Sequence, residues 1–127
     1  MERQELFGRL ERAGCHPQQA LERFMNNEDL FLSFLKQLPE RMNLTPLFQG
    51  LEREDEEQFY RYIHDLKGMT GNLGLTPVYD CAQAMLVEFR TSKFKHKNKL
   101  TALTLEVQTE CRALTKLVQQ YEMEEER

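Results

Sequence analysis

Apolar residues recur at intervals of three and four along most of this chain. This spacing constrains the fold more than any other feature, because it places side chains along one face of an α-helix. It is strongest in four long segments, at about residues 30–53, 56–74, 76–89 and 100–121. Apolar and polar residues do not alternate with period two over a useful length, so we predict an all-α protein.

Capping residues mark the ends of several of these helices. Asn27 precedes the acidic pair Glu28-Asp29, which suits the positive end of a helix dipole, and Asp55 is placed to cap the second long segment. Gly74 is expected to end that segment in the left-handed conformation. Thr76-Pro77 signals the start of a new helix, because proline fits the first helical turn.

Two prolines interrupt the first long segment. Either one helix continues through Pro39 and Met42 with a kink, or a new helix starts at Thr45-Pro46 as cap and first position. We favour one long, irregular helix, or two nearly collinear pieces, that ends near Arg53.

Two short helical segments, at about residues 2–13 and 17–25, precede these helices, and we expect them to cover one end or groove of the core. The charged tail at 122–127 is expected to fray. Four amphipathic helices joined by short turns predict an antiparallel four-helix bundle with its core at about 27–121. A chain of 127 residues fits a single domain over 1–127.

Composition and charge argue against several classes of protein. Charged residues make up 30% and the formal net charge is −4, which argues against nucleic-acid binding. The one basic cluster, Lys93–Lys99, is expected to be a solvated turn. No apolar run approaches the ~18 residues that would span a membrane, and the N-terminus lacks a secretion signal. We therefore expect a cytoplasmic protein without membrane insertion.

Three cysteines, Cys15, Cys81 and Cys111, give an odd number and no Cys-x-x-Cys pair. Disulfide scaffolding and a structural zinc site therefore lack their sequence signals. We expect Cys81 and Cys111 to be buried thiols in a reducing compartment, Cys15 to lie in a turn, and no metal to be bound. His16 and His96 are expected to be surface residues.

The helix predicted at 56–74 carries the candidate chemistry on one face. At about 100° per residue, its apolar positions gather on one side. These positions are Phe59, Tyr62, Ile63, Leu66, Thr70 and Leu73. His64 lies on the opposite, polar face, with Lys67, Gly68 and Gly71 at offsets of three, four and seven.

Two glycines on an otherwise good helix need a reason, because each costs about 1 kcal/mol relative to alanine. Helical side chains lean toward the N-terminus, so residues three and four places after His64 would lie over its imidazole. Gly68 leaves that flank open, Gly71 leaves the next turn open, and Lys67 is expected to place its ammonium beside the ring. The pattern indicates an exposed nucleophile that meets a large partner and carries an anion.

The stretch His64-x-Leu66-Lys67-Gly68-x-x-Gly71-Asn72-x-Gly74 resembles the phosphoacceptor motif of histidine-containing phosphotransfer (HPt) domains. Residues 20–31 are similar to the start of the family's first long helix, and 47–59 to the approach to the histidine. The resemblance covers about residues 18–90. The last helix shares only the general helical character of the family and no specific motif.

The resemblance implies a helical bundle that accepts a phosphoryl group from the aspartyl phosphate of a receiver domain and passes it to another receiver, in two-component signal transduction. His64 matches the phosphorylated histidine, Lys67 the lysine beside the phosphoryl group, and Gly68 the position that lets a receiver approach. The receiver would supply metal and most charge stabilisation, so a phosphocarrier is implied rather than an enzyme. Because no nucleotide-binding motif occurs, we expect no ATP site and no cofactor.

The remaining positions lie at the edges of this motif. Gly71 is expected to share in receiver access, and Gly71, Asn72 and Gly74 match positions near the helix end, where their role is conformational. Many family members carry a small residue before the histidine and threonine after it, where this chain has Ile63 and Asp65. Asp65 is expected to lie off the reactive face. Neither departure removes the acceptor, and both are candidates for tuning the choice of partner.

A receiver is expected to bury apolar and small residues around the glycine face. Phe7, Leu10, Phe24 and Met25 are candidates for this surface from the N-terminal segment. We expect a monomer, and Met1 together with the charged tail favours a free-standing protein over a piece of a hybrid kinase.

Two rival functions stay open. A docking regulator or phosphate sink would bind a receiver without onward transfer, and it would keep His64 and the glycine face. A non-catalytic helical interaction protein would use the glycines for tight packing with a partner helix. The sequence leaves open which kinase and regulator the protein serves, and the direction of phosphate flow.

Overall fold

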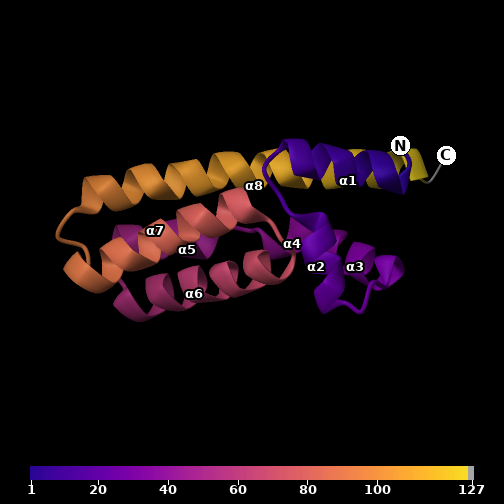
Figure 1. Cartoon of the computed structure of the whole chain (residues 1–127). Helices are drawn as coiled ribbons and strands as arrows, with labels where there is room; N and C mark the ends of the chain where they lie inside the picture. Colours follow the sequence, from indigo (N-terminus) through magenta and orange to yellow (C-terminus); the bar gives the residue numbers. More distant parts are fainter. Residues whose placement is uncertain (126–127) are drawn as a thin grey trace.

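A computed structural model describes residues 1–125, in which eight helices and no strand occur (Figure 1). In chain order the helices are α1 (Arg3–Arg12), α2 (Pro17–Arg23), α3 (Glu28–Leu35), α4 (Leu38–Arg41), α5 (Thr45–Arg53), α6 (Glu56–Asn72), α7 (Thr76–Ser92) and α8 (Lys97–Glu125). None of the described helices is both long and apolar enough to cross a membrane. The all-α prediction is confirmed.

The helices α5, α6, α7 and α8 form the bundle. α5 contacts α6, α6 contacts α7, α7 contacts α8, and α8 returns to α5, so the four close into a ring. Connections of two, three and four residues join consecutive helices. Such short connections require antiparallel neighbours, and Figure 1 shows α6, α7 and α8 in adjacent layers. The predicted antiparallel four-helix bundle is confirmed.

Two capping residues that were predicted from the sequence form hydrogen bonds at the starts of their helices. Asn27 Oδ1 accepts a hydrogen bond from Leu30 N, and Asp55 Oδ1 accepts one from Gln58 N, each at 3.1 Å. These bonds satisfy backbone donors that a helix start leaves without a partner. Gly74 follows the end of α6 with φ of +69°, which is the left-handed conformation predicted for it.

The segment predicted as one long helix up to Arg53, or as two collinear pieces, is divided into α3, α4 and α5. Pro39 lies in the first turn of α4 and Pro46 in the first turn of α5. Because proline lacks the N–H that a helix interior needs, each proline starts a helix instead of continuing one. Asn43 Oδ1 accepts a hydrogen bond from Thr45 N at 3.1 Å in the break. The restart at Thr45 is confirmed, and the long helix is wrong.

The last helix, α8, runs for 29 residues and extends beyond the predicted segment 100–121 at both ends. Two ion pairs hold its C-terminal end. Glu124 Oε2 lies 2.6 Å from the terminal nitrogen of Met1, and Glu125 Oε1 lies 2.8 Å from Lys36 Nζ. The prediction of a fraying tail is therefore wrong for residues 122–125, and the last two residues of that tail lie outside the described range.

The helix α1 covers the C-terminal part of α8, as predicted for the N-terminal segment (Figure 1). Its apolar stripe is buried in this contact, since Phe7 and Leu10 are each 1% exposed. Their prediction as receiver-docking residues is wrong for that reason. Phe24 is partly buried, with its ring centroid 5.7 Å from that of Phe31. Met25 is the fully surface-exposed candidate, at 89%.

A buried carboxylate anchors the turn between α7 and α8. Glu88 is 9% exposed, with Oε1 at 2.9 Å from His96 Nδ1 and Oε2 at 3.5 Å from Lys99 Nζ. The hydrogen bond with His96 holds the pKa of the Glu88 carboxyl below its usual value. His96 is exposed, as predicted, and its ring also ties the basic turn to α7.

The helices α5 and α6 approach each other closely at Gly50. This residue is buried, and a Cβ added to it would lie 3.1 Å from Phe59 N and 3.2 Å from Phe59 Cα. The Phe59 ring is fully buried, with centroids of Phe89 and Phe94 at 5.2 and 5.6 Å. The position of α6 in the bundle therefore depends on a backbone approach that only glycine allows without displacement.

We expect Gly50→Ala to destabilise the bundle, because its methyl group would press on the backbone of α6 and not on a movable side chain. The matched control is Gly8→Ala, where an added Cβ meets only Arg12 Nη1 at 3.8 Å. Alanine there should stabilise α1 by about 0.5–1 kcal/mol. In urea unfolding, the midpoints of the two variants should move in opposite directions. Their free energies of unfolding should differ by about 1–3 kcal/mol. A midpoint for Gly50→Ala at or above that of the wild type would contradict the close contact.

Candidate functional site

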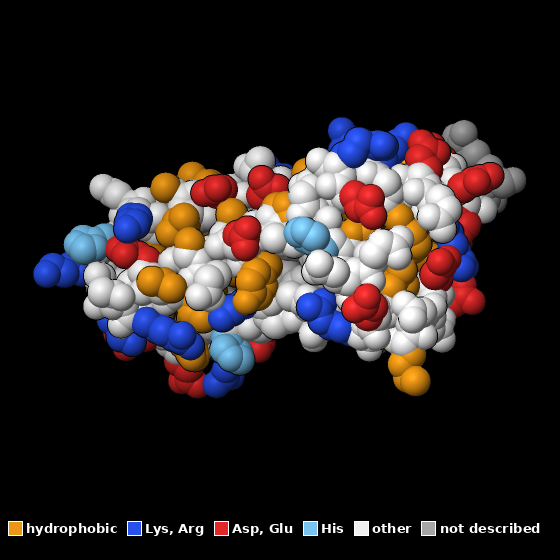
Figure 2. All heavy atoms as spheres, viewed as in Figure 1, with side chains coloured by type: hydrophobic (Ala, Val, Ile, Leu, Met, Phe, Trp, Pro, Cys, Tyr) orange, Lys and Arg blue, Asp and Glu red, His pale blue; other side chains and the backbone are white. Residues whose placement is uncertain are grey.

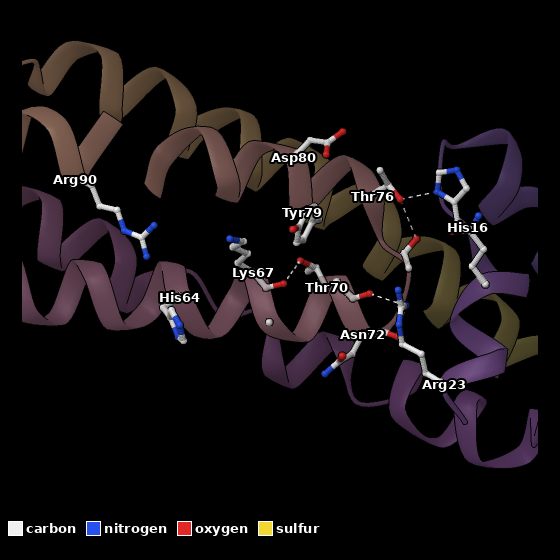
Figure 3. A pocket seen from close by; sticks show the side chains of 14 residues that line it. His16, Arg23, His64, Lys67, Thr70, Asn72, Thr76, Tyr79, Asp80 and Arg90 are labelled. Atoms are coloured by element: carbon white, nitrogen blue, oxygen red, sulfur yellow. Dashed lines mark hydrogen bonds between the residues drawn. The ribbon is translucent and has the colours of Figure 1, made fainter. Parts of the chain in front are cut away.

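His64 lies on the solvent face of α6. On the opposite face, Phe59, Ile63, Leu66 and Thr70 are buried, as the three-four spacing predicts. The His64 side chain is 63% exposed, and Figure 3 shows it projecting away from α7. The burial of one face of α6 thus fixes the other face, and the imidazole with it, in solvent.

A shallow groove of about 610 Å³ runs beside His64 between α6 and α7 and reaches α2 (Figure 3). The six site residues predicted from the sequence all line it. They are His64, Lys67, Gly68, Gly71, Asn72 and Gly74. Figure 2 shows that this face carries charged, histidine and scattered apolar side chains without one continuous apolar area.

Lys67 and Gly68, which lie one helical turn after His64, differ in their surroundings. A Cβ added to Gly68 would have no atom within 4 Å, so this flank is open, as predicted. Lys67 Nζ lies over the Tyr79 ring, 5.8 Å from its centroid, and Figure 3 shows the lysine pointing toward α7 while His64 points away. In this structure the ammonium therefore lies beside a tyrosine and not, as predicted, beside the imidazole.

Gly71 makes room for the same tyrosine. A Cβ at this position would lie 3.2 Å from Tyr79 Cε2 and 3.3 Å from Tyr79 Cδ2. The expectation that Gly71 leaves open surface is corrected, because a side chain of α7 fills the space above it. This glycine lets α6 and α7 approach each other.

Gly74 joins the N-terminal segment to the end of α6. A Cβ here would lie 2.5 Å from the carbonyl oxygen of His16. His16 N donates to Gly74 O at 2.8 Å, and His16 Nδ1 lies 2.7 Å from Thr76 Oγ1. The helix-end role predicted for Gly74 therefore includes a close backbone contact with the residue that precedes α2.

Arg23 of α2 reaches the C-terminal end of α6. Its Nη1 donates to Gly71 O at 2.9 Å and to Asn72 O at 3.4 Å. These carbonyls lie at the negative end of the helix dipole and lack partners within the helix, so a guanidinium is favourable there. The sequence gives no signal for Arg23, because the contact joins residues 48 positions apart.

Most of the groove lies in the part of the chain that matches a known family. A family model described as the Hpt domain matches residues 29–124, about three quarters of the chain. The chain belongs to the Hpt domain family. Comparisons with curated proteins and with solved structures found no match. Hpt domains act in histidine phosphotransfer within two-component phosphorelays, as phosphocarriers that interact with receiver domains and have no ATP site of their own.

Two residues beside His64 in this Hpt domain escaped the sequence reasoning. The Tyr60 ring stacks on His64, with centroids 5.9 Å and planes 25° apart. The four-residue spacing of this pair was a signal that could have revealed the contact. Arg90 Nη2 donates to the Tyr60 hydroxyl at 3.3 Å. This second contact joins α6 to α7 and has no counterpart in the local sequence pattern.

Asp65 directly follows His64 in α6. Its Oδ1 lies 3.9 Å from His64 Nδ1. This distance is too long for a hydrogen bond. Asp65 does not line the groove beside His64, and its predicted position off the reactive face stays a prediction.

The three cysteines of the Hpt domain are free and buried, as predicted for Cys81 and Cys111. Burial raises the pKa of Cys15 and Cys81 to about 11 and that of Cys111 to about 12. Since the thiolate is the reactive form, these thiols are poor nucleophiles near neutral pH. Within residues 1–125, no group of three or more His, Cys, Asp or Glu side chains is arranged to hold a metal ion.

We expect Gly74→Ala to destabilise this Hpt domain by at least about 1–3 kcal/mol, because alanine would adopt a strained positive φ and meet the His16 carbonyl. The control is Gly68→Ala within α6, where an added Cβ meets nothing within 4 Å, and it should stabilise α6 by about 0.5–1 kcal/mol. Urea midpoints measure both effects, and amide exchange at His16 should accelerate in Gly74→Ala alone. Equal midpoints for the two variants would show that the glycines are interchangeable, contrary to the structure.

Proposed function

We propose that His64 accepts a phosphoryl group from the aspartyl phosphate of a receiver domain and passes it to a second receiver. The observation that carries this proposal is an imidazole that is 63% exposed beside a glycine with an open flank. A receiver must bring its phosphorus within bonding distance of a ring nitrogen, which a crowded histidine would prevent. The other histidines are engaged elsewhere, His16 with Thr76 and His96 with Glu88.

The proposed step moves one phosphoryl group between two proteins. A ring-nitrogen lone pair attacks phosphorus, the acyl P–O bond breaks, and its electron pair returns to the receiver carboxylate. The ring gains a positive charge when the N–P bond forms.

Lys67 supports the transfer as a mobile cation. Its ammonium lies over Tyr79, and a cation–π contact of this kind is worth only about 0.5–1 kcal/mol at an exposed site. The lysine side chain has a flexible four-carbon stem and carries a point charge. We therefore propose that Lys67 leaves the tyrosine and contacts the phosphoryl oxygens once they are on the imidazole.

The direct test is transfer of label from a panel of phosphorylated receivers. Wild-type protein and the control His96→Gln should take up an acid-labile phosphoryl label, whereas His64→Gln should take up none, because glutamine has no ring-nitrogen nucleophile. Labelled protein is measured after gel separation, with and without acid treatment. Label on His64→Gln would refute the site, and no label on the wild type from any receiver would favour a docking regulator.

The labelled protein also distinguishes transfer from storage. After purification away from the donor, it should lose its label to a second, unphosphorylated receiver. A phosphate sink would keep the label until hydrolysis. A non-catalytic interaction protein would take up no label, and it would bind its partner equally well as His64→Gln.

The helix α2 extends the surface that we propose for the receiver. His16, Gln19 and Arg23 line the groove, although they precede the start of the family match at residue 29. The backbone bond from His16 to Gly74 and the Arg23 bonds to the end of α6 fix this wall in place. A receiver that covers the groove would meet α2, so we propose that α2 contributes to the choice of partner.

We expect Gln19→Trp to slow phosphoryl uptake from a receiver by about tenfold, equivalent to about 1.4 kcal/mol, because the indole would fill part of the groove. The matched control is Gln18→Trp, an exposed neighbour on α2 that does not line the groove. Phosphoramidate, a small donor without a docking surface, should phosphorylate both variants at the wild-type rate. Unchanged uptake from the receiver by Gln19→Trp would contradict the α2 contact.

A further inference from the structure

Tyr60 lies one helical turn before His64 on the solvent face of α6. Its ring is stacked on the imidazole, with centroids 5.9 Å apart and an angle of 25° between planes. Helical side chains lean toward the N-terminus, so the imidazole leans over the tyrosine and not away from it. One face of the imidazole therefore rests on Tyr60, while the ring as a whole stays exposed.

Tyr60 is itself held from α7. Arg90 Nη2 donates to its hydroxyl at 3.3 Å, and Arg90 Cζ lies 5.9 Å from the centre of its ring. The Phe89 ring centroid lies 6.4 Å away on the side of the core. Figure 3 shows Arg90 extending from α7 toward α6 on the side of His64. Three contacts from a second helix thus restrain a side chain that is 37% exposed.

We infer that Tyr60 is a positioning residue that holds the imidazole of His64 in one orientation for attack on phosphorus, and that Arg90 holds Tyr60 in turn. This inference rests on the function proposed above. An exposed histidine without a neighbour samples several rotamers, and in-line attack requires one of them. The stack selects that rotamer before the receiver arrives, so less ordering is left for the encounter.

The position of Tyr60 argues for this role over a purely structural one. The core under α6 is filled by fully buried side chains, Phe59 and Ile63 among them, while Tyr60 lies at the surface. Its hydroxyl bonds to an exposed arginine and to no buried group. What the tyrosine restrains is the histidine above it.

The experiment compares Tyr60→Leu, which removes the aromatic platform, with Tyr60→Phe, which keeps the ring and loses the bond to Arg90. Phosphoramidate is the probe, so that no receiver contact enters the rate. Tyr60→Leu should slow phosphorylation of His64 by about three- to tenfold, and Tyr60→Phe should recover most of the rate. Arg90→Gln, which leaves the aromatic ring in place, should give an intermediate loss and serves if Tyr60→Leu fails to fold.

A spectroscopic measurement reports the stack directly. In proton NMR of the unphosphorylated protein, the His64 ring protons should carry a ring-current shift that Tyr60→Leu removes and Tyr60→Phe retains. With a receiver as donor, Tyr60→Leu should lower the maximal rate by the same factor as with phosphoramidate and leave the half-saturating receiver concentration unchanged.

Two results would overturn the inference. A wild-type rate for Tyr60→Leu with phosphoramidate would show that the stack does not position the ring. A loss seen only with receivers, through a higher half-saturating concentration, would make Tyr60 a docking contact instead. Failure of the proposed function is separate from both, because it would appear as label on His64→Gln.

Discussion

Burial of one face of α6 is the constraint on which the rest of the structure depends. Phe59, Ile63 and Leu66 are each at most 3% exposed, and burying a side chain of this kind is worth about 1.5–3 kcal/mol. Any rotation of α6 that covered His64 would bring these residues into water at a cost of several kcal/mol. The exposure of the histidine is therefore set mainly by the buried residues on the opposite face of α6, and the site needs no separate device to stay in solvent.

Three of the four glycines along this part of the chain have different structural reasons, although all four look alike in the sequence. Gly50 lets α5 approach the backbone of α6, and Gly71 makes room for Tyr79 of α7. Gly74 combines a positive φ with a close contact to the N-terminal segment. Gly68 is the exception, since an added Cβ would meet nothing. A helix-weakening residue with no structural reason is the one that points to an approaching partner.

How much the sequence could predict depends on how far apart in the sequence the interacting residues lie. The helices, their caps at Asn27 and Asp55, and the exposure of His64 depend on residues within a few positions, so spacing alone identified them. The contacts of Lys67 with Tyr79 and of Arg90 with Tyr60 join different helices. Their existence depends on helix rotation and separation, which the apolar pattern does not specify to the accuracy of one side chain.

The unequal lengths of α5 and α8 explain how the N-terminal helices cover one end of the bundle. The break at Pro39 and Pro46 leaves α5 with nine residues, whereas α8 has 29 and continues past it. That extension presents apolar surface that the short α5 cannot cover, and α1 covers it with its buried stripe. Once α1 lies along α8, the chain that follows must return toward the α6–α7 turn, where α2 is fixed through His16 and Arg23. The wall that α2 adds to the groove is thus a consequence of unequal helix lengths, and it brings residues from outside the family match next to the site.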